Sequence, residues 1–115
     1  MKKQTAVYLR HIRDAIAWIE DYTRDMDEEG FRKNHMVQDA VLKQIEVIGE
    51  AAKHIPPGFT GRHPEVPWKD IVGMRDIVVH NYFGVDISAT WKTVSTDIPV
   101  LKNTIDTLLR NIKDS

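Results

Sequence analysis

The stretch Met74–Tyr82 contains the residues of this chain that are best suited to chemistry. It combines a fixed cation, a carboxylate, an imidazole and a phenol in a short span, with the spacing Arg-x4-His-x-Tyr. These residues are Arg75, Asp76, His80 and Tyr82. Histidine titrates near neutral pH, and the arginine fork pairs with two oxygens of a phosphate. The stretch therefore indicates acid–base chemistry on an anionic substrate.

Cleavage of RNA without a metal ion needs the two functions that His80 and Arg75 provide. A base must take the proton of the ribose 2′-hydroxyl, and a cation must hold the charge that develops on the phosphate. Asp76 lies four residues before His80, a helical spacing at which a carboxylate accepts a hydrogen bond from an imidazole. A structural histidine and an arginine–aspartate salt bridge have the same spacing, so spacing alone leaves both interpretations open.

Apolar residues at intervals of three and four indicate four helices that must position this stretch. The expected helices span 5–25, 34–54, 67–82 and 87–113, and the sequence has no alternating strand pattern or repeat. It therefore predicts one all-α domain, residues 1–115, with the four main helices in a bundle. The helix at 34–54 has the broadest apolar stripe, so we expect it to lie at the centre, packed on two sides.

Capping and turn residues predict where these helices begin and end. Asn34 is suited to begin the second helix, and either Asp86 or Ser88 is suited to begin the last one. Gly30 is suited to a left-handed turn after the first helix. The segment 55–66 is rich in proline, glycine and basic residues, so we expect an exposed loop there.

The third and fourth helices have features that bear on shape and assembly. Pro99 removes a backbone donor inside the fourth helix, so we expect a kink or split near Asp97. The apolar surface of the two helices is broad enough to leave Ile71 and Val78, beside Arg75, partly exposed in a monomer. We therefore expect a two-fold dimer that pairs the two motifs across a cleft.

Composition limits the classes of protein that this chain represents. Its 42% hydrophobic and 29% charged residues are typical of a globular protein, and a net charge of -1 disfavours a dedicated nucleic-acid binder, so contact with RNA must be local. The absence of cysteine excludes disulfides and thiolate metal sites. No apolar run approaches the roughly 20 residues needed to cross a bilayer. We therefore expect a cytoplasmic protein without membrane contact.

Two other groups of residues offer alternative sites. Glu46, Glu50 and His54 are each four residues apart, so one helix face offers a metal ion two carboxylates and an imidazole. An ion-paired or solvated face is the better-supported interpretation, because no second cluster completes the site. A surplus of basic side chains between residues 31 and 63 offers contacts to an RNA backbone, although scattered surface charge is the ordinary explanation. These residues are Arg32, Lys33, Lys43, Lys53 and Arg62.

The segment Gly73–Tyr82 resembles the signature of the HepT-like toxins, a branch of the HEPN superfamily, whose pattern is Arg-x4-His-x-Tyr. The resemblance extends along essentially the whole chain. Tyr8–Ile16 is similar to the family's first helix, Ile48–Lys53 to its second, and Val66–Ile71 to the approach to the motif.

The resemblance implies a four- to five-helix bundle of HEPN type that forms a homodimer and acts as a metal-independent ribonuclease without a cofactor. It assigns catalysis to Arg75 and His80 and support to Asp76. It also implies a partner, a nucleotidyltransferase antitoxin of the MntA type, which blocks the enzyme by attaching AMP to Tyr82. A non-catalytic HEPN bundle that serves as a binding or regulatory subunit of such a nucleotidyltransferase is the alternative.

Overall fold

The computed structural model describes the backbone of residues 2–82 and 86–112, and the side chains of this part of the chain except those at 2, 3 and 79–82. Every element in it is helical, which confirms the all-α prediction. The elements are α1 (Lys2–Tyr22), α2 (Glu28–Arg32), α3 (His35–Lys53), α4 (Pro57–Gly61), α5 (Trp68–Gly73), α6 (Arg75–Tyr82), α7 (Ile87–Lys92), the π-helical segment η1 (Thr93–Asp97) and α8 (Ile98–Ile112). No helix among the described residues combines the length and apolar character needed to cross a membrane.

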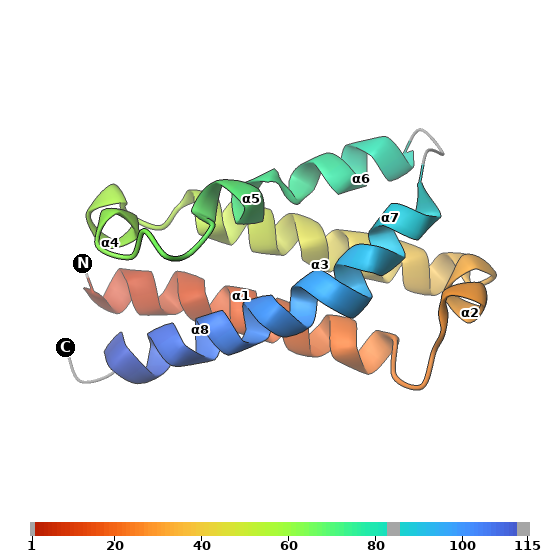
Figure 1. Cartoon of the computed structure of the whole chain (residues 1–115), viewed down its shortest axis with the longest axis horizontal. Coiled ribbons are helices and arrows are strands. Elements are labelled where there is room, and N and C mark those ends of the chain that lie inside the picture. Colours follow the sequence, from red (N-terminus) through yellow and green to blue (C-terminus); the bar gives the residue numbers. More distant parts are fainter. Residues whose placement is uncertain (1, 83–85, 113–115) are drawn as a thin grey trace.

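The helix α3 lies at the centre of the molecule, as its broad apolar stripe predicts. It packs against α1 along one side and against α5 and α6 along the other, and α8 packs against α1 (Figure 1). Full burial of one large aliphatic side chain contributes about 1.5–3 kcal/mol, so the core formed by α1, α3 and α8 holds the long helices together. Its side chains have little or no exposure and include Leu9, Ile12, Ile16, Ile19, Val41, Ile45, Ile48, Leu101, Ile105 and Leu108.

Two of the expected helix caps are confirmed. The Asn34 side chain accepts a hydrogen bond from the amide of Val37 (3.1 Å), which satisfies a donor that has no partner inside α3. Asp86 accepts one from the amide of Ala89 (2.9 Å) and so begins α7. Ser88, the other candidate for this position, lies inside α7 and has a different role.

Ser88 joins α7 to the short helix α2. Its hydroxyl donates to the Glu28 carboxylate (2.9 Å) and accepts from the Arg32 guanidinium (2.7 Å), which also bonds to Glu28 (2.9 Å). The hydrogen bond from Ser88, followed by that from Arg32, lowers the pKa of Glu28 from its ordinary value. This polar link attaches α7 to α2.

Two expectations for the connecting segments are wrong. Gly30 lies inside α2, and Asp25 makes the left-handed turn instead, with φ of 60°. Aspartate tolerates this conformation because its short polar side chain bonds locally. The segment 55–66 is not simply an exposed loop, because α4 forms there and the chain buries Phe59 and Val66 against the core.

The expected third helix is interrupted at Met74. Here α5 ends just before this residue and α6 begins just after it. The amide of Met74 donates to the carbonyl of Ile71 (3.2 Å), and the amide of Ile77 donates to the carbonyl of Met74 (3.0 Å). Bonds to a carbonyl three residues back have the tighter 3₁₀ geometry, and Gly73 disfavours a helix interior. The prediction of one continuous helix over 67–82 is therefore wrong.

The fourth expected helix is also interrupted, at the place that Pro99 predicts. In the structure it consists of α7, η1 and α8, which together are called the last rod. The amide of Ile98 donates to the carbonyl of Thr93, five residues back, and this widened turn is the segment η1. Pro99 has no amide hydrogen to donate to the carbonyl of Ser95, so an α-helical bond is missing at this point whatever the geometry. The π-type turn accommodates the loss. The expected split near Asp97 is confirmed.

Candidate active site

The Arg75 side chain lies across α3 at a position where that helix has no side chain. A Cβ atom added to the buried Gly49 would lie 2.5 Å from Cγ of Arg75 and 3.0 Å from its Cδ. The gap at Gly49 therefore holds the aliphatic part of Arg75 against the α3 backbone. Glycine inside a helix costs about 1 kcal/mol relative to alanine, and what it provides here is this close approach.

Glu50, the next residue of α3, pairs with the guanidinium group of Arg75. The Nη1 atom of Arg75 lies 3.0 Å from Oε1 of Glu50, and the two side chains are 43% and 44% exposed. A pair with this exposure contributes about 0–1 kcal/mol to stability, so its main effect is orientation. Gly49 fixes the stem of Arg75 and Glu50 fixes its head. The guanidinium has further N–H groups with which to bind an anion.

Arg75 lines a hollow of about 330 Å³ between α3 and the junction of α5 with α6. This volume lies at the lower end of the range of about 300–1,000 Å³ for small-molecule sites. Asp76 is exposed and lines the same hollow, together with Glu46, Val72, Gly73 and Val78. The break at Met74 makes Arg75 the first residue of α6, so the break determines where the arginine enters the hollow.

His80 and Tyr82 follow Arg75 on α6, but their side chains lie outside the described residues. The backbone places His80 five residues after Arg75, which is a rotation of about 140° on an ideal helix, whereas Asp76 and His80 are on one face. Arg75 and Asp76 are thus brought to one hollow, and all four predicted site residues share one helix of 8 residues. The assigned roles of these residues remain predictions.

The alternative metal cluster of Glu46, Glu50 and His54 does not form. Glu50 pairs with Arg75, and Glu46 lies 3.7 Å from the amine of Lys43. The His54 ring lies beside a tyrosine ring of α1. Among the side chains that the structure describes, which leave out those at 2, 3 and 79–82, no three histidine, aspartate or glutamate groups are arranged to hold a metal ion.

The expected basic surplus is partly neutralised by neighbouring carboxylates. Arg32, Lys33 and Lys43 each pair with a glutamate three or four residues away along the chain. Lys53 and Arg62 are exposed near the ends of α3 and α4. Three of the five charges therefore have compensating partners nearby, whereas Arg75 is held beside a hollow by its contacts with both Gly49 and Glu50.

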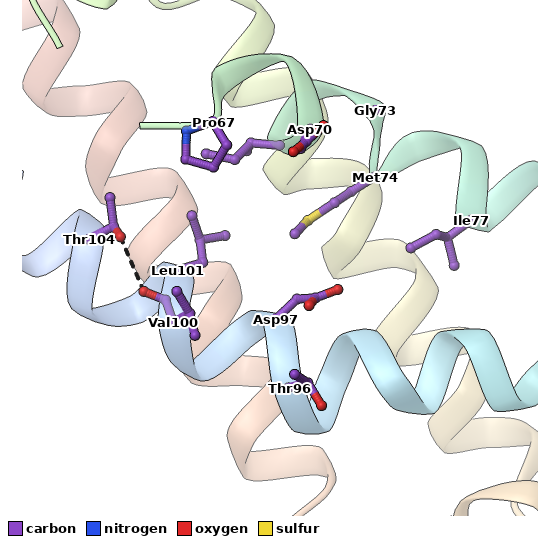
Figure 2. Close-up of a pocket in the computed structure, with 11 residues that line it drawn as sticks. Pro67, Asp70, Gly73, Met74, Ile77, Thr96, Asp97, Val100, Leu101 and Thr104 are labelled. Atoms are coloured by element: carbon purple, nitrogen blue, oxygen red, sulfur yellow. Dashed lines mark hydrogen bonds between the residues drawn. The ribbon is translucent and has the colours of Figure 1, made fainter. Parts of the chain in front are cut away.

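A second, more apolar hollow of about 410 Å³ lies between two parts of the chain. On one side is the α5–α6 rod, which is α5 and α6 joined at Met74, and on the other are η1 and α8 of the last rod. Figure 2 shows Met74 reaching from the α5–α6 junction toward Leu101 of α8, with Ile77 nearby on α6. The expectation that Ile71 is partly exposed in the monomer is wrong, because it is 2% exposed and belongs to the core. The same expectation for Val78 is confirmed, because this side chain is half-buried and lines the hollow of Arg75.

The apolar and polar spacing of the sequence does not predict the contacts of Arg75 with Gly49 and Glu50. The sequence pattern assigns Glu50 only to the alternative metal cluster and gives Gly49 no role. One signal was present, because a glycine in the middle of an apolar helix indicates a close approach of another segment. Which segment approaches is a long-range property that the pattern of α3 does not contain.

Comparison with known proteins gives a consistent family. A family profile described as "Ribonuclease HepT-like" matches residues 12–108. The chain is 45% identical over 108 residues to a protein of Thermococcus cleftensis named "Probable ribonuclease HepT", a match that covers 94% of this chain and 98% of the relative. It is also 46% identical over 105 residues to a protein of Methanocaldococcus jannaschii named "Gamma-glutamylcyclotransferase and putative RNase". That match covers 91% of this chain and 47% of the relative, so the chain spans about half the length of that protein.

No solved structure gives a significant match to the chain. The family profile nevertheless includes α3 with Gly49 and Glu50, the α5–α6 junction and the whole Arg-x4-His-x-Tyr motif. Both the profile and the relatives cover most of the sequence, and the chain therefore belongs to the ribonuclease HepT-like family.

Proposed function

We propose that this protein is the toxin of a toxin–antitoxin pair and cleaves RNA without a metal ion, using Arg75 and His80. The observation that carries the proposal is the fixed position of Arg75, whose stem lies in the gap at Gly49 and whose head is oriented by Glu50 beside a hollow. A preorganised cation of this kind stabilises negative charge that develops in a transition state. Family membership, with relatives named as ribonucleases, supports RNA as the substrate.

In the proposed reaction, His80 takes the proton of a ribose 2′-hydroxyl as that oxygen attacks the adjacent phosphorus. The bond from phosphorus to the 5′-oxygen breaks, and the leaving oxygen takes a proton from the protonated imidazole. Arg75 pairs with the non-bridging phosphate oxygens, and Asp76 holds the imidazole in the required tautomer. The products are a 2′,3′-cyclic phosphate and a free 5′-hydroxyl, and the atoms balance without a metal ion.

The test is cleavage of RNA by the purified protein in excess EDTA. We expect the parent protein to cut, and Arg75→Ala and His80→Ala to lose about 10²–10⁴-fold in rate. Arg24→Ala is the matched control, because it removes an exposed arginine that also pairs with a carboxylate, Asp21, at 2.9 Å. Variants that cut as fast as the parent would refute the assignment. A parent protein that cuts no RNA would favour the non-catalytic subunit of a nucleotidyltransferase.

We further propose that a nucleotidyltransferase antitoxin silences the enzyme by attaching AMP to Tyr82. The added phosphate carries negative charge on the same helix as Arg75, which would pair with it instead of with RNA. Intact-mass spectrometry after co-expression with the antitoxin should show the mass of AMP on the parent protein and on Tyr22→Phe, but not on Tyr82→Phe. An undiminished increment on Tyr82→Phe would place the modification elsewhere.

A homodimer is the third part of the proposal. The support is the apolar hollow beside Met74 and Ile77, together with the exposed side chain of Val100 (65%) at its edge. Light scattering at micromolar concentration should give the mass of two chains. Val100→Glu should weaken this association, whereas Val7→Glu, at an exposed valine of α1 (37%), should not. A parent protein that is monomeric at this concentration would contradict the dimer.

A further inference from the structure

A hollow of about 340 Å³ lies in the groove between α1 and α3, directly beside the site of Arg75. Val47 and Ala51 line it with small apolar side chains, and the larger lining residues are Tyr8, His11, Lys43, Glu46, Glu50 and His54. Glu46 lines this hollow and that of Arg75, and Glu50 lines it while pairing with Arg75. A ligand held by Arg75 therefore has this hollow as its immediate neighbour.

Three rings lie together along the groove. The Tyr8 ring centre is 5.7 Å from that of His54, with a tilt of 42°, and 6.2 Å from that of His11, at 85°. Tyr8 is half-buried and both histidines are exposed. Aromatic and imidazole faces of this kind are the surfaces on which unpaired RNA bases stack.

The charges of the hollow select a base rather than a phosphate. Glu46 and Glu50 repel a phosphodiester here, because Lys43, the lysine of this hollow, is already 3.7 Å from Glu46. In the neighbouring hollow the guanidinium of Arg75 offsets these carboxylates. A carboxylate accepts hydrogen bonds from the exocyclic amino groups of cytosine, adenine and guanine. Uracil has no amino group and presents carbonyl oxygens at the corresponding positions. The hollow thus favours a base that carries an amino group.

We propose that Tyr8, His11 and His54, with Glu46, form a nucleobase subsite that takes an unpaired, amino-bearing base of the RNA next to the phosphate held by Arg75. This inference rests on the proposed ribonuclease function and adds sequence preference to it. Tyr8 and the histidines supply stacking surface, and Glu46 distinguishes adenine and cytosine from uracil.

Binding of short, labelled 2′-O-methyl oligonucleotides of A, C or U tests the subsite without cleavage, because these lack the attacking hydroxyl. Fluorescence anisotropy should show that the parent binds oligo-U about 10- to 150-fold more weakly than oligo-A or oligo-C, the range for one hydrogen bond to a charged group. Glu46→Gln should remove this difference, because an amide also donates to uracil. Equal affinities of the parent for the three oligonucleotides would overturn the subsite.

The stacking surface is tested by Tyr8→Ala, which should weaken oligo-A binding by about 5- to 150-fold, the range for one base on an aromatic ring. Tyr8→Phe keeps the ring and should bind as the parent does. Tyr22→Ala is the matched control, since Tyr22 is a half-buried, ring-stacked tyrosine of the same helix outside the hollow. An equal loss in Tyr22→Ala would assign the effect to the packing of α1 and refute the inference. Base-selective binding by a parent that cuts no RNA would refute the ribonuclease function and leave the subsite standing.

Discussion

The two interrupted rods of this molecule break in opposite ways. At Met74 the chain tightens, with hydrogen bonds three residues back, whereas in η1 it widens, with a bond five residues back. The widened turn buries Thr93 and Val94 in the body of the protein. The tightened turn delivers Arg75 to a hollow, over Gly49.

The breaks at Met74 and in η1 therefore differ in their physical cause and in what they position. Pro99 makes the break in the last rod unavoidable, because a backbone donor is missing there. Nothing covalent forces the break at Met74, since Gly73 only lowers the preference for a helix. The break at Met74 is therefore held by packing. Changes that disturb this packing should affect the site far more than changes in η1.

Among the changes that test this comparison of the two breaks, the largest effect should come from closing the gap under Arg75. Gly49→Ala places a methyl group 2.5 Å from Cγ of Arg75 and 3.2 Å from the carbonyl oxygen of Val72, so the arginine must move. Misplacement of a catalytic group by about 1 Å costs on the order of 10²-fold in rate, and we expect a loss of that size in RNA cleavage. Gly58→Ala is the control, since a Cβ there meets no atom within 4 Å. Parent-like cleavage by Gly49→Ala would show that the close approach is not needed.

A smaller loss of activity should follow from making the α5–α6 junction more helical. A Cβ added at Gly73 meets no protein atom within 4 Å, so no neighbouring side chain has to move to make room for Gly73→Ala. It should raise the free energy of unfolding by about 0.5–1 kcal/mol while rotating Arg75 away from Glu50, and cleavage should fall by about tenfold, because a displacement below 1 Å costs less than 10²-fold. Urea unfolding and steady-state cleavage measure the two quantities. A rise in both would contradict the functional role of the break.

In the last rod, restoring the missing backbone donor should change the free energy of unfolding but not the rate of RNA cleavage. Pro99→Ala restores an amide hydrogen for the carbonyl of Ser95 and should raise the free energy of unfolding, by at most about 3 kcal/mol. Cleavage should stay as in the parent, because η1 lines neither the hollow of Arg75 nor the proposed base subsite. A marked loss of cleavage would mean that the two breaks are coupled.

The smallest effect concerns the link from α7 to α2. The pKa of Glu28 is lowered from 4.5 by Ser88 and Arg32, so its contribution to stability is present above pH 4.5 and is lost as the pH falls through the lowered value. Ser88→Ala should therefore destabilise the protein slightly at pH 7, and the difference from the parent should vanish in strong acid. Thermal unfolding at pH 7 and pH 3 measures it, and a difference that grows toward acid would contradict this sign.

Local chemistry explains which structural predictions succeeded. The helical periods, the Asn34 cap and the break before Pro99 each depend on residues close together in sequence, so the sequence contains their causes. The break at Met74 and the gap at Gly49 arise from packing between α3 and the α5–α6 rod. Spacing within one helix contains no record of its partner, so the site could be located along the chain but not assembled. For the same reason, the sequence placed Tyr8 in the first expected helix but did not predict its contacts with His11 and His54.

The attachment of the α5–α6 rod has a dynamic consequence. Its main packing partner is α3, and its side toward α8 borders the apolar hollow instead of a packed core. Local opening requires the least free energy where few buried contacts must be broken. Backbone amides between Trp68 and Val78 should therefore exchange with deuterium sooner than those of α1 or the middle of α3. Arg75 is therefore carried by a segment that we expect to open before α1 and the middle of α3, and a bound ligand that spans Arg75 and α3 should slow this exchange.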